Sequence, residues 1–153
     1  MRIVCKNKKA LRDYEVIETF EAGIALVGSE VKSLRAGRVS LKDSYAKVKD
    51  GELWLYNMHI SPYEKSAAYS PEPKRKRKLL MHKKEIVRLK SLTEERGYTI
   101  VPLEIYFNDR GIAKVKIAVV KGRKKYEKKQ YLIQKQLERK KERELRDYLR
   151  RKG

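Results

Sequence analysis

The sequence predicts a mainly β fold: a small closed antiparallel β-barrel of about six strands with flanking helices and a basic C-terminal tail. Short segments rich in β-branched and aromatic residues recur through the first two-thirds of the chain. Turn signals separate them, among them Asp50-Gly51 and the run Asn108-Asp109-Arg110-Gly111. Apolar residues make up 41% of the 153 residues, which is enough for one small core but not for two.

Six segments are predicted as strands. They are Tyr14–Phe20, Ala22–Gly28, the weaker Tyr45–Val48, Leu53–Ile60, Tyr98–Phe107 and Ile112–Val120. From Ile112 to Ile117 apolar and polar residues nearly alternate, as in a strand with one face in water. Because the segments are short and closely spaced by turns, a small barrel or sandwich is expected.

Two helices and one loop complete the predicted domain. Ser29–Ala36 has apolar residues at helical spacing with Gly37 at its end, and Met81–Glu95 has a stronger pattern that stops at Gly97. Between them, Ser70-Pro71-Glu72-Pro73 leads into the five successive cations Lys74–Lys78. We interpret this stretch as an exposed basic loop.

The composition changes near Gly122, so we divide the chain into a barrel, residues 1–122, and a tail, residues 123–153. Residues 121–153 hold 15 Lys or Arg and 5 Asp or Glu, a net charge of +10. Apolar residues there are too sparse to dock a helix on the barrel. We expect this tail to be disordered when free and helical once it is bound to an anionic partner.

The charge of the whole chain indicates a polyanionic partner. Forty Lys and Arg against 20 Asp and Glu give +20, which favours nucleic acid. Ten tyrosines are interleaved with these charges; they either stack on unpaired bases or simply sit at the barrel rim. Motifs of DNA-reading modules are absent from the sequence, and a small barrel with aromatic residues resembles the OB architecture, so RNA is favoured.

Other classes of protein are disfavoured. The sequence has no apolar run long enough for a membrane span and no signal core after Met1, and Cys5 is its single cysteine. We therefore expect a cytoplasmic protein without membrane partner, disulfide, metal or cofactor. Glu30-Val31-Lys32 with Asp13 loosely matches metal-dependent nucleases, but such patterns arise by chance in a chain rich in Glu and Lys. We expect no enzymatic activity.

Ordered motifs along the chain resemble the small protein B family, whose members are SsrA-binding proteins. The motifs are Asn7–Ala10 with Tyr14, Phe20–Ile24, Gly28–Arg35, Asp43–Tyr45, Gly51-Glu52, His59–Tyr63, Arg77–Leu80, Pro102-Leu103 with Tyr106-Phe107, Lys114–Ile117 and Lys121–Lys124. The resemblance covers essentially the whole chain.

The resemblance implies a specific function. Family members fold as an OB-like barrel and bind the tRNA-like domain of transfer-messenger RNA. Together they enter stalled ribosomes and the unfinished peptide is tagged, a process called trans-translation. The tail reaches the decoding centre of the small-subunit rRNA and the empty message channel. We expect a monomer. The alternative is a general or ribosomal RNA-binding protein held mainly by phosphate contacts.

The resemblance also implies site residues. The barrel residues implied in RNA binding are Asn7, Lys8, Lys9, Glu30, Lys32, Arg35, His59, Pro62, Tyr63, Arg77, Lys78 and Lys114. Two roles stay open for Glu30: it accepts hydrogen bonds from bases or orients neighbouring cations, or it forms a buried structural ion pair.

In the tail the implied ribosome contacts are Lys124, Tyr126, Glu127, Lys128 and Lys129. The family pattern has an Asp-Lys-Arg triplet where this chain has Glu127-Lys128-Lys129, and often His where this chain has Tyr126. Charge is kept, but Lys129 lacks the bidentate fork of an arginine. Either ring at position 126 can stack on a base of the decoding centre.

Overall fold

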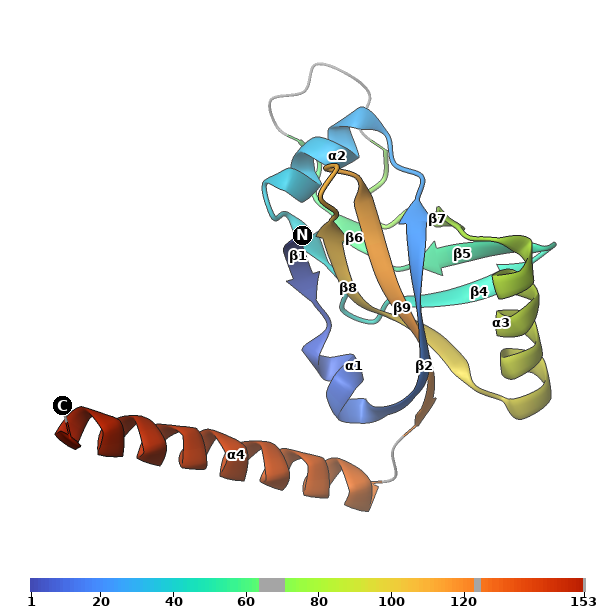
Figure 1. The fold of residues 1–153 in the computed structure, drawn as a ribbon. Coiled ribbons are helices and arrows are strands. Elements are labelled where there is room, and N and C mark those ends of the chain that lie inside the picture. The colour runs from blue at the N-terminus through green and yellow to red at the C-terminus, as the bar shows by residue number, and fades with distance from the viewer. Residues whose placement is uncertain (64–70, 123–124, 153) are drawn as a thin grey trace.

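The computed structural model describes residues 1–63, 71–122 and 125–152, and it has a β-rich body with one long C-terminal helix (Figure 1). The elements are, in chain order, β1 Arg2–Lys6, α1 Lys8–Asp13, β2 Tyr14–Ile24, α2 Gly28–Arg35, β3 Val39–Ser40, β4 Tyr45–Lys49, β5 Glu52–Tyr56, β6 His59–Ile60, β7 Arg77–Leu80, α3 Lys83–Arg96, β8 Thr99–Phe107, β9 Ala113–Gly122 and α4 Lys125–Lys152.

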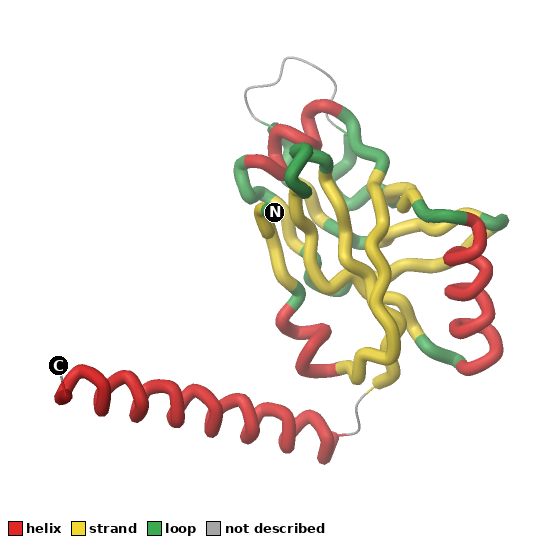
Figure 2. The backbone as a smooth tube through the Cα atoms, viewed as in Figure 1, coloured by secondary structure: helices red, strands yellow, loops and turns green. Residues whose placement is uncertain are grey.

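Six of these strands pair in a ring. The order is β8-β4-β5-β7-β2-β9, and β9 pairs back with β8. All pairings are antiparallel, and β1 adds to β8 outside the ring. The link between β4 and β8 is thin, because it consists of the single pair Ala46 with Ile100. The predicted mainly β fold, an antiparallel barrel-like ring with flanking helices, is confirmed (Figure 2).

The main core fills the inside of the ring. Side chains with almost no exposed surface meet there from opposite strands, among them Leu53, Leu55, Ile105 and Ile117. A second, smaller cluster lies on the outer face of β8 and β9, where Ala10 of α1 packs against residues such as Val101 and Val120. The short helix α1 is therefore fixed to the body by apolar contacts.

The strand predictions are right in place but not in every boundary. Tyr14–Phe20 and the first part of Ala22–Gly28 belong to one continuous strand, β2, which ends at Ile24; the predicted strand runs too far, since Gly28 already begins α2. The predicted strand Leu53–Ile60 is interrupted at Asn57, whose φ of 66° turns the chain. Its second part, β6, leaves the large sheet and pairs with β3. Two elements that we did not predict, β1 and α1, precede β2.

The predicted exposed loop at Lys74–Lys78 is wrong in its second half. Arg77 begins strand β7, which lies between β5 and β2 in the ring. Inward and outward side chains alternate along it, since Arg77 and Leu79 are buried whereas Leu80 is exposed. The charge run hid this alternation, because an arginine occupies an inward position that sequence patterns assign to apolar residues.

Both predicted helices form, as α2 and α3. Helix α3 ends where the sequence predicts, since Gly97 adopts the left-handed conformation with φ of 67°. The C-terminal segment is the continuous helix α4, whose described side chains are nearly all exposed. The prediction that this tail becomes helical only when bound stays a prediction.

The conformation of Gly97 predicts an asymmetry between two glycines. Gly97→Ala should lower the free energy of unfolding by about 1–2 kcal/mol, because a Cβ strains the left-handed conformation. Gly28→Ala is the matched control, since Gly28 is the first residue of α2 and no atom lies within 4 Å of a Cβ built there. Urea denaturation of both variants measures the difference, and equal effects would contradict this account.

Candidate RNA-binding interface

A buried carboxylate lies at the centre of the candidate interface. The side chain of Glu30, in the first turn of α2, is only 3% exposed. Its Oε1 accepts a hydrogen bond of 3.1 Å from the backbone N–H of Val27, which caps the start of the helix. A buried carboxylate requires positive partners, because an unpaired charge is costly away from water.

Two arginines supply that charge. Arg75 donates from both Nε and Nη2 to Glu30, at 3.2 and 2.5 Å, and Arg77 donates from Nε at 2.6 Å. Burial alone would raise the pKa of Glu30, but the hydrogen bonds from Arg75, Val27 and Arg77 outweigh it and hold this pKa below its ordinary value. The carboxylate is therefore ionised at neutral pH.

The Arg77 guanidinium is fully buried, and its hydrogen-bond donors are engaged by other groups of the protein. It donates to the backbone carbonyls of Met58, Pro73 and Arg75 at 2.6, 2.9 and 3.1 Å, besides Glu30. Burial lowers the pKa of Arg77, and Glu30 opposes that shift. Arg77 thus fastens three segments, α2, the chain after β5 and residues 73–75, to one another. The expectation that Arg77 belongs to an exposed basic loop is wrong, and it offers no surface to an RNA.

Exposed cations and a tyrosine lie on the surface that this network holds. Lys32 and Arg35 are exposed on α2, and the Nζ of Lys32 lies 5.6 Å from the ring centre of Tyr63. Ser33 donates to the carbonyl of Ser61 at 2.6 Å, which ties α2 to the segment that contains Pro62 and Tyr63. The sequence-predicted residues around α2 are therefore brought together.

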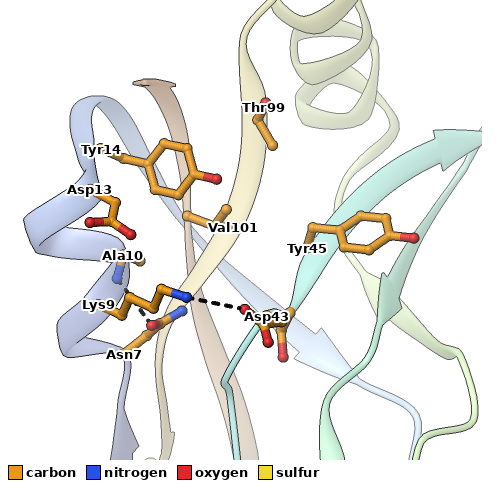
Figure 3. Close-up of a pocket in the computed structure, with 10 residues that line it drawn as sticks. Asn7, Lys9, Ala10, Asp13, Tyr14, Asp43, Tyr45, Thr99 and Val101 are labelled. Atoms are coloured by element: carbon orange, nitrogen blue, oxygen red, sulfur yellow. Dashed lines mark hydrogen bonds and ion pairs between the residues drawn. The ribbon is translucent and has the colours of Figure 1, made fainter. Parts of the chain in front are cut away.

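The other predicted group lies at α1, at the opposite end of the body (Figure 1). Asn7 is 8% exposed; its Nδ2 donates to the carbonyl of Pro102 at 2.9 Å, and its Oδ1 accepts from the N–H of Ala10 at 3.2 Å. Lys8 and Lys9 are exposed, and Lys9 lies 3.5 Å from Asp43 (Figure 3). Asn7 thus positions the helix that presents the two lysines.

Strand β1 joins the two groups. At one end Arg2 donates to the backbone carbonyl of Arg35 at 2.8 Å, and at the other end Asn7 follows Lys6 directly. Exposed Arg2 and Lys6 extend the positive surface between α2 and α1. Neither Arg2 nor Arg75 was among the predicted residues, and no feature of the sequence distinguishes them from the other cations.

The remaining predicted residues are placed less centrally. His59 is half-buried in β6, Lys78 pairs with Glu52 at 3.1 Å, and Lys114 lies on β9 opposite Gly23 and Tyr106. Beside Lys114, the hydroxyl of Tyr106 donates to Glu21, and burial together with that contact raises the pKa of Tyr106. In the tail, Lys124 lies outside the described residues, as do the side chains of Tyr126, Glu127 and Lys128; Lys129 is exposed on α4.

The structure does not bring Asp13 and Glu30 together as the loose nuclease pattern would require. Glu30 is engaged by arginines, and Asp13 lies at the end of α1, at the other end of the body. Among residues 1–63, 71–122 and 125–152, no His, Cys, Asp and Glu side chains cluster so that they could hold a metal ion. In the same ranges, no helix has both the length and the apolar character needed to cross a membrane.

The buried ion pairs predict an unequal response to charge removal. Glu30→Gln should lower the free energy of unfolding at pH 7 by about 3–5 kcal/mol, because Arg77 keeps its charge without a counter-ion. Lys78→Ala, which removes an exposed ion pair, should cost about 0–1 kcal/mol. Denaturant titrations with both variants measure this contrast.

The pH dependence of the stability difference between wild type and Glu30→Gln provides the control. Because the pKa of Glu30 is lowered, the carboxylate stabilises the protein above the ordinary glutamate pKa of 4.5, and that stabilisation is lost as the pH falls through the lowered value. The difference between wild type and Glu30→Gln should therefore shrink on acidification. A difference that stays constant down to pH 2 would contradict the ion-pair account.

Known proteins are similar to this chain in sequence. The family model described as SmpB protein matches residues 4–147. The SsrA-binding protein of Desulforudis audaxviator is 53% identical over 138 residues, 90% of this chain and 90% of that protein. That of Carboxydothermus hydrogenoformans is 52% identical over 145 residues, 95% of this chain and 97% of that protein.

A solved structure extends the comparison to three dimensions. A chain in "tmRNA-SmpB: a journey to the center of the bacterial ribosome" is 54% identical, with a TM-score of 0.67 over 79% of this chain and 85% of that chain. The family match spans the barrel and most of the tail, and the two relatives each match 90% or more of the chain. The chain therefore belongs to the SmpB family.

Proposed function

We propose that this protein binds the tRNA-like domain of transfer-messenger RNA and delivers it to stalled ribosomes for trans-translation. The observation that carries the proposal is the match to SsrA-binding proteins, at 53 and 52% identity over 90 and 95% of the chain. The neighbour that contains tmRNA, SmpB and the ribosome supports the same partners. The protein acts in the cytoplasm, where ribosomes are, and it catalyses no reaction itself.

The barrel supplies the RNA-binding surface. Lys32, Arg35 and Tyr63 offer two cations and one ring for stacking, and the buried ion pair of Glu30 holds their segments in place. Lys8 and Lys9 contribute charge at the far end of β1. Phosphate contacts from such lysines and arginines give affinity, whereas ring and base-edge contacts give selectivity. Glu30, Arg77 and Asn7 act by positioning and do not touch RNA.

The tail acts on the ribosome. Its apolar side chains are not used to pack on the barrel: Leu137, Leu145 and Leu149 are 54, 59 and 59% exposed. A helix with a net charge this positive repels itself and is stabilised by a channel lined with phosphates. The resemblance to the family implies that the tail occupies the decoding centre and the empty message channel, through Lys124, Tyr126, Glu127, Lys128 and Lys129.

A competition binding experiment tests the division of labour. The full-length protein and a variant truncated after Gly122 would be titrated with the tRNA-like domain at near-physiological salt, with excess ordinary tRNA present. Both should bind the tRNA-like domain selectively, because recognition lies in the barrel. If neither discriminates, or if truncation abolishes binding, the protein is a general RNA binder held by phosphate contacts.

The proposed role of the tail predicts that RNA binding and peptide tagging can be separated by mutation. Tyr126→Ala should reduce peptide tagging in a reconstituted translation reaction while the affinity for transfer-messenger RNA stays unchanged, because the ring is needed only at the decoding centre. Tyr126→Phe is the matched control, since it keeps the ring and should retain tagging. A large loss of RNA affinity in Tyr126→Ala would count against this role.

A further inference from the structure

A row of side chains crosses the outer face of five neighbouring strands. In the antiparallel register the row runs from Ile3 of β1 to Tyr106 of β8, Lys114 of β9, Gly23 of β2 and Leu80 of β7. Directly opposed residues of an antiparallel pair place their side chains on the same face of the sheet. Lys114 is therefore the one cation of this row, with a tyrosine opposite it on one side and a glycine on the other.

A hydrogen bond from Tyr106 crosses over β9 to β2. Tyr106 is only 6% exposed, and its hydroxyl donates to Oε2 of Glu21. Strand β9 lies between β8 and β2, so the two side chains meet above it (Figure 1). Tyr106 is opposite Lys114 and Glu21 is opposite Lys116, so the hydrogen bond crosses β9 between these two lysines. We call this pair the Tyr106–Glu21 bridge.

The Glu21 carboxylate has two cations in neighbouring positions and pairs with neither. Lys116 is directly opposite Glu21 and Lys114 is its diagonal neighbour, a distance that long side chains can span. Within residues 1–63, 71–122 and 125–152, neither lysine takes part in an ion pair. The carboxylate accepts from a neutral phenol instead, although hydrogen bonds between carboxylate and ammonium groups are stronger.

The two lysines differ in their surroundings. Lys116 lies between two acidic residues, since Glu21 is opposite it on β2 and Glu104 is opposite it on β8. The residues opposite Lys114 are Gly23 and Tyr106, and neither of them carries a negative charge. Gly23 has no side chain that can pair with the ammonium group. Of the two lysines, Lys114 is therefore the one that is available to an anion from outside the protein.

We propose that Tyr106 is a positioning residue for RNA binding, which holds the Glu21 carboxylate over β9 and thereby leaves Lys114 free to contact a phosphate of the RNA. Tyr106 is buried and does not itself touch the RNA. The family resemblance already implies the contact of Lys114, and the role of Tyr106 is the new step. The inference rests on the proposed function, because it takes RNA as the ligand of Lys114.

The variant Tyr106→Phe tests the role of the hydroxyl, because it keeps the ring. Without the hydroxyl, Glu21 is free to pair with Lys114 and competes with the phosphate for that ammonium group. Affinity for the tRNA-like domain of transfer-messenger RNA should fall about two- to fivefold, the range expected for an exposed ion pair that must break. The slope of log affinity against log salt should become shallower, by at most about 0.7–0.9, because one phosphate contact is weakened.

A double-mutant cycle with the full-length protein shows whether the effect depends on Lys114. Lys114→Gln should weaken RNA binding at least as much as Tyr106→Phe does. The double variant should bind no more weakly than Lys114→Gln alone, because no ammonium group is left for Glu21 to occupy. A loss of affinity through general destabilisation would add to that of Lys114→Gln, so the cycle separates positioning from a merely structural role.

Two controls and a rescue complete the design. Tyr56→Phe removes the hydroxyl of a tyrosine on β5, which makes no hydrogen bond within the described residues, and should leave affinity and salt slope unchanged. Lys84→Gln removes an exposed cation of α3, and its effect should add to that of Tyr106→Phe. Glu21→Gln in the Tyr106→Phe background removes the competing charge and should restore the affinity to within about twofold of the wild type.

The outcomes separate this inference from the proposed function. If Tyr106→Phe binds RNA as tightly as the wild type, if its effect adds to that of Lys114→Gln, or if Lys114→Gln has no effect, the positioning role is wrong. The proposed function is judged on the wild type alone, by selective binding of the tRNA-like domain over ordinary tRNA. If the wild type binds both RNAs equally, the proposed function fails, and the same cycle measured with ordinary tRNA still decides the role of Tyr106.

Discussion

A carboxylate held away from water beside two guanidinium groups governs the arrangement of this protein. Glu30 begins α2, Arg75 belongs to the chain before β7, and Arg77 is the first residue of β7. Neither the Glu30 nor the Arg77 charge is tolerable inside the protein alone, so helix, strand and connecting segment must come together in one arrangement. The Arg77 guanidinium adds hydrogen bonds to three backbone carbonyls, and the constraint thereby reaches the segment after β5 as well.

The buried network determines where the residues proposed to bind RNA lie. Lys32 and Arg35 lie two and five residues beyond Glu30 on a helix whose start is capped by that carboxylate. The segment with Pro62 and Tyr63 is tied to the same helix through Ser33. Under the proposed function, a residue that contacts no RNA is therefore needed for RNA binding, because it fixes the residues proposed to contact it. Asn7 has the same relation to Lys8 and Lys9 at the other end of β1, where it caps α1 and anchors it to Pro102.

The strands that carry alternating apolar residues and the helices that end at glycines are predictable from the sequence, because those patterns are local. Strand β7 is not, since the inward Arg77 looks like part of a charge run and only its distant partner Glu30 makes burial possible. Helix α1 is not predictable either, because it is short and is held by Ala10 against a second core. For the site, residue types pointed to RNA in general, and the resemblance named the residues. Some of those residues are buried and support the surface, and others are exposed and available to RNA. The sequence does not separate the two kinds, because burial depends on partners that are distant along the chain.

Hydrogen exchange of the backbone amides, with and without the tRNA-like domain of transfer-messenger RNA, tests the central claim most directly. The account predicts slower exchange on binding across α2 and residues 59–63, with smaller changes at α1, while α4 exchanges as it does in the free protein. The buried network should be protected already in the free protein, because it is formed before RNA arrives. Protection confined to α4, with α2 unchanged, would contradict the claim that the barrel recognises the RNA and the tail is kept for the ribosome.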